Sequence, residues 1–241
     1  MDSQDTPYFP GIMQRFRRAV TNRILKGLLD TICKVDNHEY IEALSKTEPL
    51  LIVINHINFL EVPMLVTHSY PIYCTGLVKE ETWKNSIFSF IFNTYKAIPI
   101  NRSGSYRETF RRVREAIDRG FFVAVAPEGT RSKDGILREG KAGIIQLAID
   151  ANSPILPIAH YGGQQIWRNI KRFKRTPFVF KAGRPFRIKC SGGRPGRGER
   201  FQILNEIMGQ IARLLPVEMR GIYTEHAEQE CTHLEFIERN V

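Results

Sequence analysis

The stretch Pro49–Ile54, with the sequence PLLIVI, is a short and almost wholly apolar run. Such a run is typical of a β-strand that is buried on both faces. Further runs of this kind follow along the chain at Ile72–Leu77, Ala97–Ile100, Phe121–Ala126 and Ile155–Ala159. Helical stretches lie between them, around Ser86–Tyr95, Tyr106–Asp118 and Ala142–Ala151. Strands that alternate with helices predict an α/β fold, a single domain with a largely parallel central sheet flanked by helices.

The chain has 241 residues, of which 42% are hydrophobic and 25% are charged. These values exclude a disordered, collagen-like or disulfide-scaffold protein. With no internal repeat or low-complexity linker, we expect one main domain over residues 41–224. An N-terminal amphipathic helix region over residues 1–40 precedes it. An acidic tail over residues 225–241, with five Glu against one Arg, follows it.

Positive charge is concentrated in one segment. The formal net charge is +10, and residues 165–200 contain twelve Lys or Arg against one acidic residue, Glu199. This concentration indicates either a solvated face or a surface for an anionic partner, such as a membrane or a phosphorylated ligand. Few aromatic residues are interleaved for base stacking, and no RNA- or DNA-binding signature is present. We therefore expect no nucleic-acid partner.

Residues 11–33 predict an amphipathic helix in which Ile12, Phe16, Val20, Ile24 and Leu28 recur every four residues. Cations occupy much of the remaining surface, as in helices that lie in a membrane interface. A helix packed on its own domain fits the pattern equally well.

The first residues, MDSQDTPYFPG, are acidic and lack the apolar core of a signal peptide. The longest uncharged stretch, Val62–Val78, contains two prolines and is shorter than a membrane span of about 20 residues. We therefore expect no transmembrane helix and a peripheral position at the cytoplasmic face of a membrane. The four cysteines lie far apart, with no His at metal-ligand spacing, which indicates free thiols and no metal site.

Polar side chains follow the strand Pro49–Ile54 directly. His56 lies just beyond its carboxyl end, where open α/β sheets bind ligands, and Glu61 comes five residues later. A carboxylate on Nδ1 would fix the tautomer and leave Nε2 as a general base. The same pair also occurs as a purely structural contact, so these two residues alone do not decide between the roles.

Two more strands lead into polar loops. The sequence IPINRSG presents Arg102, and APEGTRS presents Glu128 and Arg131. The guanidinium fork of arginine fits a phosphate. The sequence contains no GxSxG elbow, no catalytic Cys context and no P-loop. A His base with phosphate-binding arginines suits direct transfer of a group to a hydroxyl of a phosphorylated acceptor.

The ordered set NHINFLE, IPINRSG, APEGTRS and ILPIA resembles the four sequence blocks of the glycerolipid acyltransferase family. This family contains lysophosphatidic acid acyltransferases and glycerol-3-phosphate acyltransferases. The blocks extend from Asn55 to Ala159, under half of the chain. The resemblance implies transfer of a fatty acyl group from a thioester to the free hydroxyl of a lysophospholipid. Lysophosphatidic acid, which gives phosphatidic acid, is the favoured acceptor.

The resemblance also implies roles for individual residues. His56 would remove the proton of the acceptor hydroxyl, and Glu61 would orient His56. The substrate-binding residues would be Arg102, Glu128, Gly129, Arg131 and Lys141. Of these, the two arginines and Lys141 would contact the phosphate, and Glu128 would bind the glycerol hydroxyls. The family needs no metal or other cofactor, and its members use acyl-CoA or acyl carrier protein as co-substrate at a membrane surface.

One residue departs from the family pattern. The first block normally ends in Asp, whereas this chain has Glu61. Since the charge is kept, we expect catalysis to be kept, with an altered acceptor as one consequence. The sequence leaves open another acceptor of the same mechanism, such as another lysolipid, a lipoamino acid or a glycolipid. A non-catalytic basic protein that binds membranes or nucleic acid is the remaining alternative.

Overall fold

The computed structural model describes residues 11–100, 106–189 and 195–238. These residues form one nine-stranded sheet with the main path β1-β7-β6-β2-β5-β3-β4; β8 pairs with β6, and β9 pairs with β8. The strands are β1 (Cys33–Asp36), β2 (Leu51–Ile54), β3 (Cys74–Lys79), β4 (Ile98–Ile100), β5 (Phe122–Val125), β6 (Ile155–Tyr161), β7 (Thr176–Ala182), β8 (Phe186–Ile188) and β9 (Leu234–Phe236).

Eight α-helices accompany the sheet in the described residues. They are α1 (Ile12–Ile32), α2 (His38–Ser45), α3 (Glu61–His68), α4 (Ser86–Thr94), α5 (Tyr106–Asp118), α6 (Gly143–Asp150), α7 (Ile166–Ile170) and α8 (Arg197–Arg213). Short 3₁₀ helices lie at η1 (Glu80–Lys84), η2 (Gly163–Gln165), η3 (Val217–Met219) and η4 (Gly221–Tyr223).

The centre of the sheet is parallel. Strands β6, β2, β5, β3 and β4 pair in parallel, whereas β7 pairs antiparallel to β6 and parallel to β1. The predicted α/β fold with a largely parallel central sheet is therefore confirmed. Because neighbouring parallel strands end at the same edge, the residues that follow β2, β5 and β6 lie close together.

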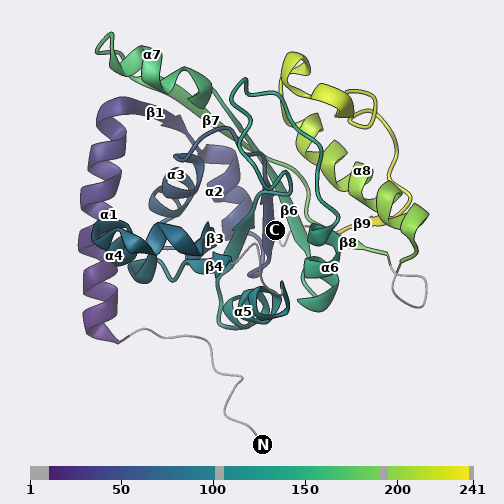
Figure 1. Ribbon diagram of the computed structural model, residues 1–241, viewed down its shortest axis with the longest axis horizontal. Helices are drawn as coiled ribbons and strands as arrows, with labels where there is room; N and C mark the ends of the chain where they lie inside the picture. Colours follow the sequence, from purple (N-terminus) through teal and green to yellow (C-terminus); the bar gives the residue numbers. More distant parts are fainter. Residues whose placement is uncertain (1–10, 101–105, 190–194, 239–241) are drawn as a thin grey trace, which may run out of the picture.

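Helices cover both faces of the sheet (Figure 1). Along β2, Leu51 and Val53 pack into a core with residues of α5, α6 and α8. The alternate residues, Ile52 and Ile54, pack into a second core with residues of α1, α2 and α3. All four side chains are at most 1% exposed, which explains why this strand consists of apolar residues alone.

Helix α1 packs on the domain through a side that carries both polar and apolar residues. Arg18 is buried, donates a hydrogen bond of 2.7 Å to the carbonyl of Ile72 and lies 3.9 Å from the ring centre of Tyr73. Asn22 accepts a hydrogen bond of 2.8 Å from the Tyr95 hydroxyl. Leu29 of α1 is buried in the second core. Six other apolar residues of α1 point away from the domain and are 42–84% exposed; they are Ile12, Met13, Phe16, Val20, Ile24 and Leu28.

The described part of the expected acidic tail is not a solvated segment. Strand β9 pairs with β8, and Leu234 is 2% exposed in the core beside α8. Ala227 is fully buried in the same core. The alternation of Leu234, Glu235 and Phe236 places the acid outward and the apolar residues inward. This strand was not predicted from the sequence because the segment around it is highly charged.

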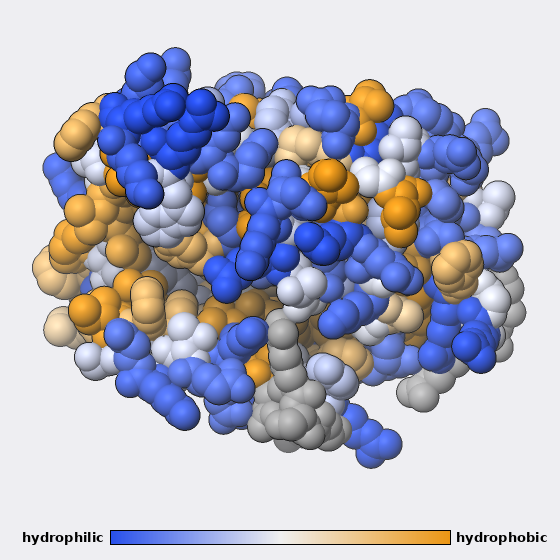
Figure 2. All heavy atoms as spheres, turned by 45° about the horizontal axis from the view of Figure 1, so that its top comes forward, coloured by the Kyte–Doolittle hydropathy of each residue, from blue (hydrophilic) through white to orange (hydrophobic). Residues whose placement is uncertain are grey.

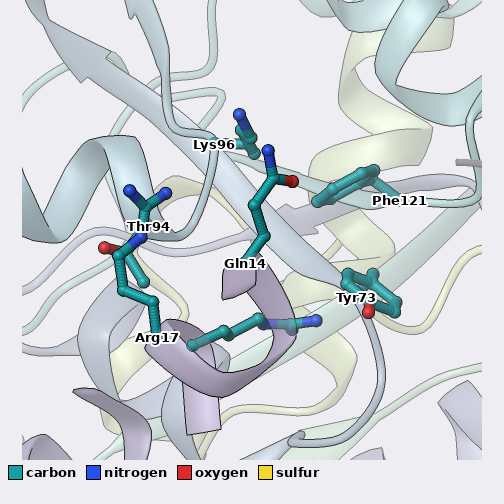
Figure 3. Close-up of a pocket in the computed structure, with 7 residues that line it drawn as sticks. Gln14, Arg17, Tyr73, Thr94, Lys96 and Phe121 are labelled. Carbon is teal, nitrogen blue, oxygen red and sulfur yellow. The ribbon is translucent and has the colours of Figure 1, made fainter. Parts of the chain in front are cut away.

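A cavity of about 10 Å³ lies beside α1 at the amino ends of β3, β4 and β5 (Figure 3). Tyr73, Lys96 and Phe121 line it, and each comes just before one of these strands. It is thus at the edge of the sheet opposite to His56.

In the described residues no helix is long and apolar enough to cross a membrane, and Cys33, Cys74 and Cys231 are free thiols.

The turn after β6 requires glycine at position 162. Gly162 has φ of +93°, and a Cβ there would lie 2.1 Å from the carbonyl oxygen of Pro177 in β7. Gly120 has a similar φ of +90° but has nothing within 4 Å of an added Cβ. An alanine at position 120 would therefore cause backbone strain alone, whereas an alanine at position 162 would cause backbone strain and steric overlap.

We predict that Gly120→Ala lowers the free energy of unfolding by about 1–2 kcal/mol, the usual cost of left-handed backbone for an L-residue. Gly162→Ala adds the overlap with Pro177 and should cost about 1–3 kcal/mol more. Denaturant unfolding of both variants measures the difference. Equal losses would contradict the close approach of the two backbones.

Candidate active site

The centre of the site is a His–Glu pair at the carboxyl end of β2. His56 follows the strand by two residues, and Glu61 is the first residue of α3. The Glu61 carboxylate contacts His56 Nδ1 through Oε1, and its Oε2 accepts a hydrogen bond of 3.1 Å from the backbone N–H of Asn58. The Glu61 side chain is 2% exposed and that of His56 is 27% exposed. Nδ1 is thereby engaged, and Nε2 is the ring nitrogen left for a substrate.

A second buried carboxylate holds the backbone of His56. Glu128 follows β5 and is 1% exposed. Its Oε1 accepts a hydrogen bond of 2.6 Å from the backbone N–H of His56, and its Oε2 accepts one of 2.9 Å from the backbone N–H of Arg138. Burial raises the pKa of Glu128 to about 7, although the two backbone donors oppose this shift. These contacts make Glu128 a positioning residue for His56, whereas its predicted contact with glycerol hydroxyls stays a prediction.

The loop after β5 also contacts the loop after β2 directly. The backbone N–H of Ser132 donates a hydrogen bond of 2.7 Å to the carbonyl of His56. Gly129 has φ of +64°, and a Cβ there would lie 3.0 Å from Lys141 Nζ, so the Lys141 side chain passes close over the glycine. The structure therefore brings five of the predicted site residues together: His56, Glu61, Glu128, Gly129 and Lys141.

Of the two predicted arginines, Arg131 lies in the described residues and Arg102 does not. Arg131 is exposed and is the residue before Ser132, so its backbone lies next to the His56 carbonyl. Its side chain is therefore free to reach outward from the edge of the site. Arg102 lies outside the described residues, and its phosphate contact stays a prediction.

Sequence reasoning missed two polar residues behind the site. His160 in β6 is fully buried, and its Nε2 lies 3.0 Å from the carbonyl oxygen of Asn55 and 3.8 Å from Glu61 Oε2. The Asn55 side chain pairs with both backbone groups of His160. Burial lowers the pKa of His160, which favours a neutral ring. The available signal was a histidine at the end of an otherwise apolar strand.

The described residues contain no cluster of three or more His, Cys, Asp or Glu side chains that could hold a metal ion.

Comparison with known proteins agrees with this arrangement. Residues 33–161, more than half of the chain, match the model of the Acyltransferase family. A 1-acyl-sn-glycerol-3-phosphate acyltransferase from Cocos nucifera is 26% identical over 172 residues, which cover 70% of this chain and 54% of the relative. An N-acylphosphatidylethanolamine synthase from Arabidopsis thaliana is 29% identical over 178 residues, which cover 68% of this chain and 61% of the relative.

A solved structure has the same fold. The crystal structure of the 1-acyl-sn-glycerophosphate acyltransferase PlsC from Thermotoga maritima aligns with a TM-score of 0.53 at 20% identity, over 80% of this chain and 76% of that one. The chain belongs to the Acyltransferase family, and the resemblance to glycerolipid acyltransferases is confirmed. The matched regions span only about half to three fifths of the two plant relatives.

The raised pKa of Glu128 predicts a pH dependence of stability. Its pKa is about 7 in the folded chain against 4.5 when unperturbed, so the folded state holds the proton between these values and the unfolded state does not. The free energy of unfolding therefore decreases as pH rises from 4.5 to about 7. The total decrease is on the order of 3 kcal/mol.

Chemical denaturation of wild type and Glu128→Gln across this pH range measures the effect. The wild-type value minus the variant value should fall with rising pH and level off above neutrality. The control is Glu139→Gln, which removes an exposed carboxylate from the same loop. It shows how much of the pH dependence of the free energy of unfolding comes from groups other than Glu128. A difference that is flat or rises with pH would contradict the burial of Glu128.

Proposed function

We propose that this chain transfers a fatty acyl group from an acyl thioester to a free hydroxyl of a lysophospholipid, with lysophosphatidic acid as the favoured acceptor. The observation that carries the proposal is the His56–Glu61 pair, in which Glu61 holds Nδ1 and leaves Nε2 for the acceptor. The names of relatives such as the Cocos nucifera enzyme support the choice of acceptor. The thioester is acyl-CoA or acyl-carrier protein.

In the proposed reaction, Nε2 of His56 takes the proton of the acceptor hydroxyl while its oxygen attacks the thioester carbonyl carbon. The resulting tetrahedral intermediate collapses, the C–S bond breaks, and the imidazolium returns the proton to the leaving thiolate. The buried Glu61 carboxylate stabilises the imidazolium between these steps. General-base removal of this kind contributes about 10²–10⁴-fold to a rate.

The cations around the pair suit a phosphorylated acceptor. Lys141 and Arg131 are exposed beside the loop that carries Glu128. We assign them, together with Arg102, to the phosphate of the acceptor, because guanidinium and ammonium groups are the usual partners of phosphate oxygens. In this assignment Glu128 acts through the backbone of His56.

A second acceptor class is favoured by one relative. The Arabidopsis protein is named for the synthesis of N-acylphosphatidylethanolamine, so its acceptor is an amine on a phospholipid. The proposed base would serve an amine in the same way as a hydroxyl, because both must lose a proton after or during attack. The test must therefore include phosphatidylethanolamine beside the lysolipids.

The decisive experiment is a mass-spectrometric product assay. Purified protein is mixed with vesicles, acyl-CoA of mixed chain length and a panel of lysophosphatidic acid, other lysolipids, glycolipid, lipoamino acid and phosphatidylethanolamine. We expect lysophosphatidic acid to gain one acyl chain, and His56→Ala to lower the rate by about 10²–10⁴-fold. Glu61→Gln, which keeps the size but removes the charge, should also lower it.

The control is His38→Ala, which removes an exposed histidine from α2 and should leave the rate unchanged. If phosphatidylethanolamine alone is acylated, the acceptor is this amine lipid in place of lysophosphatidic acid, and the proposed role of His56 is kept. A product that forms equally with His56→Ala would contradict the role of the pair. If neither acyl-CoA nor acyl-carrier protein yields a product, the non-catalytic alternative replaces the enzyme.

We further propose that the apolar side of α1 binds a membrane. The α1 face consists of Ile12, Met13, Phe16, Val20, Ile24 and Leu28 of α1, together with Ile87, Phe88 and Phe90 of α4. These side chains are exposed and gather at the left of the view in Figure 2. A shallow hollow of about 400 Å³ lies between the two helices. Because the side of α1 with Arg18, Asn22 and Leu29 holds the domain, the α1 face is available for lipid.

The α1 face gives a test by substitution. Phe16 and Ile24 are 66% and 58% exposed, and Phe16→Ser with Ile24→Ser should lower partitioning into phospholipid vesicles by at least about tenfold, because two apolar side chains no longer enter the lipid. Co-sedimentation with vesicles measures the partitioning.

The matched control is Val217→Ser with Ile222→Ser. These residues are 60% and 67% exposed but lie in η3 and η4, on the far side of the molecule from α1 (yellow in Figure 1). Equal effects of the two double variants would contradict a membrane contact that is specific to α1.

A further inference from the structure

A second exposed surface lies on the segment that follows β6. The α7 surface consists of Trp167, Arg168, Lys171, Arg172, Phe173 and Lys174, and all six residues are exposed. Phe173 is 100% exposed and Trp167 is 60% exposed. Residues 166–175 contain five cations and no acidic residue. The surface therefore combines bulky aromatic side chains with uncompensated positive charge.

The backbone holds Phe173 outward at some cost. Its φ is +53°, in the left-handed region that bulky residues rarely adopt. The conformation is held by hydrogen bonds of 3.1 Å from its own N–H to the carbonyl of Ile170 and of 2.9 Å from the N–H of Lys174 to the carbonyl of Asn169. Phe173 thus stands at the tip of a turn between Arg172 and Lys174, and none of its surface is used in the fold.

The α7 surface is joined to the catalytic loop. Phe59, which lies between His56 and Glu61, stacks on Trp167 with ring centres 5.9 Å apart. The Asn58 side chain donates a hydrogen bond of 3.0 Å to the carbonyl of Gly163, just before α7. The α7 surface is therefore in direct contact with the loop that carries the His–Glu pair.

The α7 surface also adjoins the end of α1. The Arg175 guanidinium donates two hydrogen bonds, of 3.0 and 2.7 Å, to the carbonyl of Cys33, the residue after α1. In Figure 1 α7 lies above this end of α1, and in Figure 2 its hydrophilic residues lie directly above the apolar patch. An extended flat partner is therefore able to meet both surfaces together.

We propose that the α7 surface is a second membrane contact, which binds the headgroups of anionic phospholipids and holds the catalytic loop at the bilayer. Aromatic side chains beside cations are suited to the interface of an anionic bilayer, where the rings enter among the headgroups and the cations meet their phosphates. The inference rests on the membrane association proposed for the α1 face. It adds a selectivity for anionic lipid that an apolar face alone does not give.

The test compares binding to vesicles of phosphatidylcholine alone with binding to vesicles that also contain phosphatidylglycerol. The triple variant Lys171→Gln, Arg172→Gln, Lys174→Gln should lose at least about tenfold in affinity for the anionic vesicles and keep its binding to the neutral ones. Phe173→Asn, which tolerates the left-handed backbone, should weaken binding to both. Added salt should reduce the difference between wild type and the triple variant.

The matched control is Arg112→Gln, Arg114→Gln, Arg119→Gln, which removes three exposed cations from and just after α5, at the opposite end of the view in Figure 1. If this control and the α7 triple variant lose the same affinity, net charge explains the binding and the proposal fails. If the α7 triple variant binds anionic vesicles like wild type, the proposal also fails.

An activity measurement separates this proposal from the proposed function. In micelles of an uncharged detergent, the α7 triple variant should acylate the acceptor at the wild-type rate, whereas on anionic vesicles it should be slower. Equal rates of wild type and variant on both supports would contradict the α7 contact and leave the acyltransferase proposal intact. Loss of the product in His56→Ala is independent of all these outcomes.

Discussion

The site depends on one buried carboxylate. Glu128 accepts hydrogen bonds from the backbone N–H groups of His56 and Arg138, and thereby fixes the loop after β2 against the loop after β5. The Ser132 N–H donates a hydrogen bond to the His56 carbonyl and so joins the same two loops. Both backbone groups of His56 are thus held by the neighbouring loop, and Glu61 holds the imidazole through Nδ1. Such preorganisation is what the general-base role proposed for His56 requires.

The way α1 packs relates the fold to the proposed location. A surface helix ordinarily buries its apolar stripe, whereas α1 buries Arg18 and Asn22 and exposes Phe16 and Leu28. Arg18 is paired with the Ile72 carbonyl and Asn22 with the Tyr95 hydroxyl, whereas the buried Nε of Arg17 has no hydrogen-bond partner among the described residues. The helix therefore holds the domain by hydrogen bonds and by Leu29, and it leaves most of its other apolar side chains exposed.

The sequence predicted the parallel centre of the sheet, because strands covered on both faces, such as Leu51–Ile54, consist of apolar residues alone. It did not predict β7, where Phe178 and Phe180 are buried amid a basic segment, nor β9 in the acidic one. The His56–Glu61 pair was predictable because its members are only five positions apart. The bond from His56 to Glu128 joins residues 72 positions apart, and no local pattern reveals such a contact.

Glu61, where the family pattern has Asp, is accommodated by its place at the start of α3. One carboxylate oxygen contacts His56, and the other accepts from the Asn58 N–H and lies 3.8 Å from His160 Nε2. The longer side chain is folded back into the loop, and Asn58 in turn caps the Leu60 N–H at 2.7 Å. Both oxygens therefore have partners in a group that is nearly fully buried, and one of them contacts His56 despite the added methylene. The substitution thus keeps a carboxylate beside the proposed base.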